Sequence, residues 1–153
     1  TFALNFSRPG SEVIAQYYNF LRLGRAGYER VQSNSSAIAQ YISSAIAKIG
    51  PYELITKGDE LPVFAFRLRE EIENYTVFDV SDALREGGWL VPAYTFPENC
   101  EDLSVLRVVV RAGMTKDMAD LFLDELRRRT KTLESLTEPL PDALSPKQGS
   151  FAH

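Results

Sequence analysis

The clearest strand pattern lies in residues 104–113, an apolar, β-branched run into which Arg107 is inserted. β-Branched residues suit the pleated, half-buried surface of a sheet, so this stretch predicts a β-strand. Side chains alternate along a strand, and the face expected to enter the core carries Leu106, Val108 and Val110. The opposite face carries Val105, Arg107, Val109 and Arg111. That face would present a guanidinium, which suits bidentate capture of a carboxylate.

Helical spacing of apolar residues predicts two separate helices in the first third of the chain. The first follows the turn 7–11, with Ser11 as N-cap, and runs to about Tyr28 or a little beyond. Its apolar stripe is Val13, Ile14, Tyr17, Phe20 and Leu21. The second begins in the Ser/Asn cluster 33–36 and stops at the Gly-Pro pair 50–51. Its stripe is Ile38, Ile42, Ala45, Ile46 and Ile49.

Two further helices are predicted in the second half of the chain. Residues 76–87 predict a short helix in which Thr76 and Asp79 form a capping box and Gly87 ends the helix. Thr115 is expected to cap a last long helix. The apolar stripe of that helix is Met118, Leu121, Phe122, Leu126 and Leu133.

Shorter strands are expected between these helices. Residues 52–56 and 63–68 are apolar runs joined by the Gly-containing turn 57–60, which favours antiparallel pairing. Residues 89–95 form a brief extended segment before the Arg107 strand. This order predicts an α/β fold of the α+β type, in which helices cover one face of a small, mostly antiparallel sheet.

Composition narrows the range of partners. The chain has 153 residues, a hydrophobic share of 44% and a net charge of −4, which suits one globular domain. The negative charge gives no case for nucleic acid or anionic membrane as a partner. No apolar run approaches the roughly 20 residues that span a bilayer. The lone cysteine, Cys100, cannot form an internal disulfide, which favours a reducing, cytoplasmic location.

Several kinds of catalytic apparatus are missing from the sequence. The one histidine is His153 and the one cysteine is Cys100, so neither a zinc site nor a Cys/His nucleophile is expected, and no metal site is predicted. The acidic pairs 70–71 and 124–125 are interpreted as solvated surface. The residues by themselves therefore do not predict a complete active site.

Several motifs together resemble the glutamate decarboxylases, most closely the bacterial type. They are residues 5–28 (NFSRPGSEVIAQYYNFLRLGRAGY), 48–53 (KIGPYE), 88–95 (GWLVPAYT), 106–107 (LR) and 150–153 (SFAH). The basic, Trp-containing calmodulin-binding tail of the plant enzymes has no counterpart here. The resemblance implies the aspartate-aminotransferase-like fold of type I, the cofactor pyridoxal 5′-phosphate (PLP), and assembly as homodimers or hexamers.

The resemblance also implies a division of the chain. The family's cofactor lysine lies just before the point that matches Thr1, and the chain's lysines do not stand in its motif: Lys48, Lys57, Lys116, Lys131 and Lys147. The sequence is therefore expected to be a C-terminal part of such an enzyme, inactive by itself. Residues 1–32 would be a connecting helix, 33–136 the small domain and 137–153 a mobile tail.

Three site residues follow from the resemblance. Arg107 matches the arginine that holds the substrate's α-carboxylate. Ser7 matches a serine whose hydroxyl reaches the PLP phosphate of the partner subunit. His153 matches a C-terminal histidine that plugs the active site near neutral pH, which fits an imidazole titrating near pH 6.5 and a part in acid resistance.

The expected reaction is conversion of L-glutamate to 4-aminobutyrate and CO2. Two alternatives remain open. The chain could belong to a PLP decarboxylase for another amino acid, because most residues for the substrate side chain would lie outside it. It could also be a non-catalytic subunit-interaction module.

Overall fold

The computed structural model describes residues 10–136, and these form parts of two compact units, Thr1–Asn34 and Ser35–His153. Ser7, His153 and the predicted tail 137–153 lie outside the described residues. Each unit is described below by itself. None of the helices in residues 10–136 combines the length and apolarity that a bilayer crossing requires.

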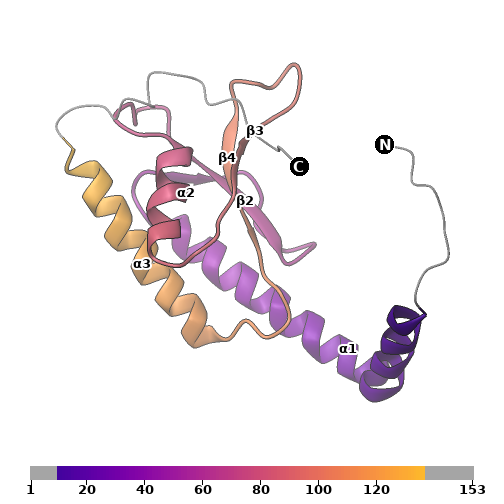
Figure 1. The fold of residues 1–153 in the computed structure, drawn as a ribbon. Helices are drawn as coiled ribbons and strands as arrows, with labels where there is room; N and C mark the ends of the chain where they lie inside the picture. The colour runs from indigo at the N-terminus through magenta and orange to yellow at the C-terminus, as the bar shows by residue number, and fades with distance from the viewer. Residues whose placement is uncertain (1–9, 137–153) are drawn as a thin grey trace. The chain divides into compact units, whose positions relative to one another are not determined.

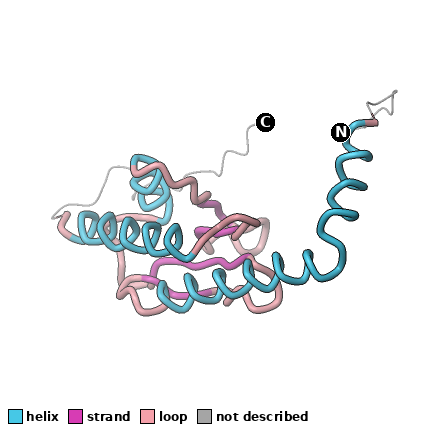
Figure 2. Tube along the Cα trace, turned by 90° about the horizontal axis from the view of Figure 1, so that it is seen from below, coloured by secondary structure: helices cyan, strands magenta, loops and turns pink. Residues whose placement is uncertain are grey.

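The first unit contains the beginning of α1 (Ser11–Ile46), which continues into the second unit. Within α1, Gly24 has φ 55° and ψ −175°, a conformation essentially restricted to glycine, and the helix bends there. Figure 2 shows α1 as two helical stretches joined at this bend. The carbonyl of Gly10, rather than Ser11, accepts the first helical hydrogen bond, from the Ile14 amide at 3.2 Å.

The prediction of two helices separated at residues 33–36 is wrong. Those residues are helical, and the interruption falls at Gly24 instead. Ser and Asn favour helix ends because their side chains bond to nearby backbone, but they can also lie along a helix. Here Ser35 is buried and the hydroxyl of Ser36 accepts a hydrogen bond from Gln40 one turn later, at 3.1 Å.

The second unit is built on a four-stranded sheet with the order β1-β2-β4-β3. Its strands are β1 (Tyr52–Leu54), β2 (Val63–Leu68), β3 (Ala93–Thr95) and β4 (Ser104–Val109). All three pairings are antiparallel, which confirms the expected sheet. The short strands β1 and β3 form its two edges.

Two further helices belong to this unit, α2 (Val77–Glu86), which follows β2, and α3 (Lys116–Glu134), which follows β4. The two helices lie side by side (Figure 1). Both start at the predicted caps. The Thr76 hydroxyl accepts from the Asp79 amide while the Asp79 carboxylate accepts from the Thr76 amide, which confirms the capping box. The Thr115 hydroxyl accepts from the Met118 amide in the same way at the start of α3.

One apolar cluster joins α2, α3 and the second-unit part of α1 to one face of the sheet. From the strands it takes in Phe64, Phe66 and Leu106, but not Ala65 or Val105, which point to the other face. The buried side of α3 consists of Ala119, Phe122, Leu123, Leu126, Thr130 and Leu133.

The α3 stripe predicted from the sequence is therefore partly wrong. Met118 and Leu121 are 42% and 64% exposed, although the same stripe correctly included Phe122, Leu126 and Leu133. Successive helical residues are turned by about 100°, so each of the two lies beside the buried row rather than in it.

Polar contacts tie α3 to its neighbours. Arg129 donates to Glu125 on its own helix and to Glu86 on α2, both at 2.8 Å. Hydrogen bonds from Arg128 and Arg129 hold the pKa of Glu125 below its ordinary value. On the other side, the hydroxyl of Tyr41 in α1 donates to Asp120.

Candidate carboxylate-binding face

The face of the sheet opposite the apolar cluster carries two arginines. Antiparallel register places Glu53 beside Arg67 and Ala65 beside Arg107. Tyr94 on β3 pairs with Val105, so its side chain points to the same face as Arg107. We refer to this surface as the open face, defined by Glu53, Ala65, Arg67, Tyr94, Val105 and Arg107, of which Ala65 and Val105 are buried.

The two arginines of the open face differ in their partners. Arg67 donates from Nε and Nη2 to the same carboxylate oxygen of Glu53, at 3.1 and 3.0 Å. Arg107 is exposed, and within residues 10–136 its side chain forms neither an ion pair nor a hydrogen bond. The positive charge of Arg67 is thus paired with the carboxylate of Glu53 on the neighbouring strand, whereas that of Arg107 is available to a ligand.

The strands position Arg107 in two ways. Its neighbour across β2 is Ala65, whose methyl group leaves the guanidinium unobstructed from that strand. On the other side, the guanidinium carbon lies 5.4 Å from the centroid of the Tyr94 ring, a cation–π contact. Such a guanidinium suits the capture of a carboxylate through two parallel hydrogen bonds.

The sequence indicated Arg107 but did not single out Tyr94. Tyr94 lies within the motif 88–95, yet its contact with Arg107 depends on the register between β3 and β4. That register cannot be read from a strand of three residues alone. An aromatic residue two positions before another, here Tyr94 and Phe96, was the available signal of an aromatic strand face.

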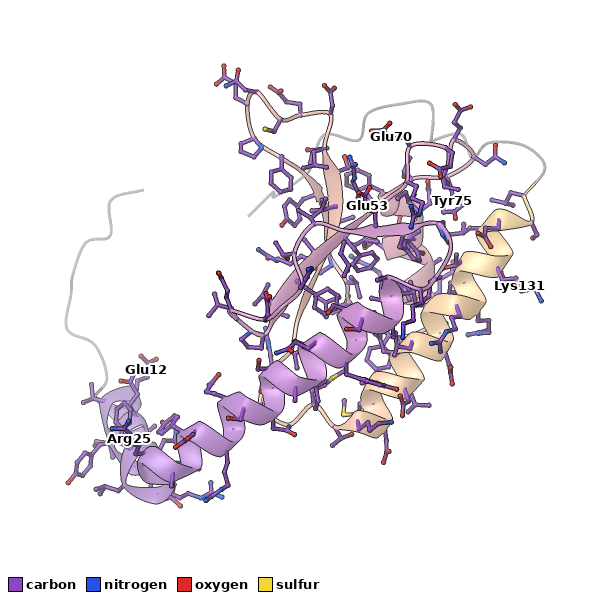
Figure 3. The ribbon with its side chains drawn as sticks, turned by 180° about the vertical axis from the view of Figure 1, so that it is seen from behind. Glu12, Arg25, Glu53, Glu70, Tyr75 and Lys131 are labelled. Carbon is purple, nitrogen blue, oxygen red and sulfur yellow. The ribbon has the colours of Figure 1, made fainter. Side chains whose placement is uncertain are left out.

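The remaining candidate groups are either outside the described residues or lie elsewhere on the described surface. Ser7 and His153 lie outside the described residues. The four described lysines, Lys48, Lys57, Lys116 and Lys131, are exposed, and Lys131 projects outward from α3 in Figure 3. The described part of the chain thus offers no enclosed amine to carry a cofactor. It also contains no cluster of three or more side chains that could hold a metal ion.

Comparison with known proteins finds similarity to decarboxylases. The family described as "Pyridoxal-dependent decarboxylase conserved domain" matches residues 1–69. A glutamate decarboxylase of Aliivibrio fischeri is 44% identical over 83% of this chain and 28% of its own length. A glutamate decarboxylase of Solanum lycopersicum is 40% identical over 92% of this chain and 28% of its own.

A solved structure extends the match to the fold. The glutamate decarboxylase of Lactobacillus brevis superimposes with a TM-score of 0.83 at 38% identity, covering 89% of this chain and 31% of that one. The fold is that of the fold-type I PLP enzymes, and the chain is homologous to part of the glutamate decarboxylases. It spans about 28% of the length of the curated relatives it matches.

Proposed function

We propose that this chain supplies the substrate-binding arginine of a PLP-dependent glutamate decarboxylase, which converts L-glutamate to 4-aminobutyrate and CO2. The observation that carries the proposal is the exposed guanidinium of Arg107, which has no carboxylate partner within the described residues. It lies in a chain that is 44% identical to a glutamate decarboxylase over 129 residues. A cytoplasmic location and assembly as homodimers or hexamers belong to the same proposal.

Arg107 would hold the α-carboxylate, the group that leaves as CO2. When bound, PLP withdraws electrons from whichever substrate bond lies perpendicular to its ring. A fixed carboxylate therefore decides which bond reacts, and misplacement by about 1 Å can cost on the order of 100-fold in rate. The paired N–H groups of an arginine fix the carboxylate plane, which the point charge of a lysine cannot do.

Two residues outside the described part complete the proposal. Ser7 would donate a hydrogen bond to the PLP phosphate, so Ser7→Ala should weaken PLP binding measured by cofactor titration. His153 would close the site near neutral pH, so His153→Ala should extend activity to higher pH. An unchanged PLP affinity or an unchanged pH profile would remove the corresponding residue from the proposal.

The decisive experiment uses the complete product of the native coding region, assayed with PLP for 4-aminobutyrate formation from L-glutamate in mildly acidic buffer. Arg107→Ala should lower kcat/KM roughly 100-fold or more because the carboxylate loses its anchor. Arg107→Lys should recover only part of this loss. Arg67→Ala is the matched control, since it removes an arginine of the same face that is already paired with Glu53.

The outcomes separate the candidate functions. Wild-type kinetics in Arg107→Ala would refute the assigned role. A panel of L-amino acids tests the substrate, and a preference for another amino acid would replace glutamate while keeping the decarboxylase assignment. No decarboxylation of any substrate would reject the enzyme proposal.

A subunit-interaction role is the second candidate, and exposed apolar residues in α1 favour it. Six side chains in its first part are 60–70% exposed: Val13, Ile14, Tyr17, Tyr18, Phe20 and Leu21. A surface of this kind favours association. Light scattering on the 153-residue chain tests this role, because a module with a defined partner surface should give one discrete oligomer. Polydisperse aggregates would argue against it.

A further inference from the structure

Tyr94 and Arg107 of the open face form a row with Phe96, the residue that follows β3. The rings of Phe96 and Tyr94 are stacked, with centroids 6.0 Å apart and an interplanar angle of 24°. The Arg107 guanidinium carbon follows at 5.4 Å from the Tyr94 centroid. Tyr94 therefore lies between another aromatic ring and the guanidinium, and it is half-buried in this position.

Backbone hydrogen bonds on both sides of Tyr94 hold this row in position. Register pairs Tyr94 with Val105, which puts Arg107 on the diagonal, within reach of a large aromatic side chain. The Arg107 amide donates to the Pro92 carbonyl at 3.1 Å, and the Phe96 amide donates to the Leu103 carbonyl at 2.9 Å. These two hydrogen bonds flank Tyr94 and hold β3 against β4, so the ring cannot shift along the strand without breaking one of them.

Within residues 10–136 the N–H groups of the Arg107 side chain have no hydrogen-bond partner, so they are free to meet a ligand. A guanidinium can pack its flat face on an aromatic ring while its N–H groups point outward in its own plane. A carboxylate binds through that edge, so the ring and the ligand do not compete for the same atoms. Arg67 shows the contrast, since its Nε and Nη2 already donate to Glu53.

We propose that Tyr94 is a positioning residue, whose ring holds the Arg107 guanidinium by its face so that its edge meets a carboxylate. The inference rests on the proposed function for the identity of that carboxylate. The ring restricts a long, otherwise unpaired side chain before the ligand arrives, and less conformational freedom is then lost on binding. The phenol hydroxyl has no part in this, whereas the aromatic ring is required.

Two substitutions separate the ring from the hydroxyl. Tyr94→Phe keeps the aromatic face and removes the hydroxyl, while Tyr94→Leu removes the face and keeps an apolar side chain. In NMR spectra of the labelled 153-residue chain, the Arg107 Nε–H and Cδ protons should show ring-current shifts in the wild type and in Tyr94→Phe. Tyr94→Leu should abolish them. The Arg107 signals are identified as those that disappear from the spectrum of Arg107→Lys.

Binding is then measured without relying on catalysis. L-Glutamate is titrated against the Arg107 Nε–H signal, and Tyr94→Leu should weaken binding about 2- to 5-fold, the range for a cation–π contact at an exposed site. Tyr94→Phe should stay within about 2-fold of the wild type, since a phenyl ring also binds cations. Tyr41→Leu is the matched control because it removes a different cation–π contact, that of Lys116 at 4.8 Å.

A double-mutant cycle distinguishes positioning from a general structural effect. In the native gene product, Tyr94→Leu should lower kcat/KM in the wild-type background and have little further effect when Arg107 is already alanine. Ring-current shifts that are absent in the wild type, or equal effects of Tyr94→Leu in both backgrounds, would overturn the inference. If no decarboxylation is found, the proposed function fails, but the shifts and the glutamate titration still decide the role of Tyr94.

Discussion

The hydroxyl of Tyr52 on β1 and the hydroxyl of Thr130 on α3 lie 2.7 Å apart in the buried core. Thr130 also donates to the Leu126 carbonyl at 2.7 Å, so its single proton is already used. Tyr52 must therefore be the donor and Thr130 the acceptor. This chain of two hydrogen bonds connects an edge strand of the sheet to the last helix.

The direction of these bonds predicts unequal effects of two substitutions. Thr130→Val leaves the buried Tyr52 hydroxyl without an acceptor and should cost about 1–3 kcal/mol in the free energy of unfolding. Tyr52→Phe leaves Thr130 still bonded to the Leu126 carbonyl and should cost about 0.5–1.5 kcal/mol. Urea unfolding measures both. A larger loss in Tyr52→Phe than in Thr130→Val would contradict the assigned direction.

Alkaline pH should destabilise the second unit through Tyr75. This residue is 3% exposed, and within residues 10–136 its hydroxyl has no hydrogen-bond partner. Burial, and then the charge of Glu134, raise the pKa of Tyr75 to about 12. An unfolded tyrosine titrates near pH 10, so the stabilising contribution is complete below about pH 10 and is lost as the pH rises toward 12.

The measurement compares wild type and Tyr75→Phe in urea unfolding from about pH 9 to pH 12. The wild type should lose up to about 1.4 kcal/mol more per pH unit in this window, the limit for one titrating group. At neutral pH the variant should be equally stable or more stable, because it removes an unsatisfied hydroxyl. Parallel curves throughout would mean that Tyr75 titrates as it does in the unfolded chain.

Gly87→Ala should destabilise the protein through a steric clash that a second substitution, Glu125→Ala, should remove. Its φ of −80° is ordinary, but an added Cβ would collide with the Glu125 carboxylate. Gly87→Ala must then displace Glu125 from Arg128 and Arg129, which should lower the free energy of unfolding. In a Glu125→Ala background the same change should cost almost nothing.

Gly88 provides the control for that cycle. Its φ is 85° and no atom lies within 4 Å of a Cβ added there, so Gly88→Ala should cost about 1–2 kcal/mol through the backbone alone. Glu125→Ala should not rescue it. Rescue of both glycine variants, or of neither, would show that the Glu125 contact does not explain the cost at Gly87.

Replacing Gly24 should destabilise α1 locally, around the bend. At φ 55° and ψ −175°, alanine should be disfavoured by about 1–3 kcal/mol, although nothing lies within 4 Å of its Cβ. Gly24→Ala should therefore change amide hydrogen exchange in the helical turns on either side. Gly50→Ala, equally open but without a positive φ, should leave exchange at these amides as in the wild type. Unchanged exchange in Gly24→Ala would mean that glycine is not required at the bend.

Elements whose signals are local were predicted well from the sequence. The strand β2 spans the predicted residues 63–68, and the Thr76–Asp79 capping box is present as expected. Both depend on neighbouring residues only, namely an apolar run between turn residues and a fixed spacing of side chains at a helix start. The Arg107 strand is likewise present, as β4.

Features that depend on long-range packing were not predicted. The cluster 33–36 has the composition of a helix start, but Ser35 is buried in the tertiary structure and the helix continues through it. Gly24 is a separate case: glycine is a poor helix former, but the spacing of apolar residues continues past it, so the sequence did not show that the helix bends there. Likewise, the contact of Tyr94 with Arg107 follows from strand register, which is set by pairing rather than by composition.

The ion pair between Arg67 and Glu53 bears on how a dicarboxylic amino acid would be oriented. A ligand with two carboxylates could bind in two opposite directions if both arginines of the open face were unpaired. Glu53 occupies Arg67 through two hydrogen bonds, which leaves Arg107 as the stronger anion site of the two. If Arg107 binds a carboxylate as proposed, the pairing of Arg67 with Glu53 would disfavour the reversed direction of binding. Specificity of this kind weakens a competing site and requires no additional contact with the substrate.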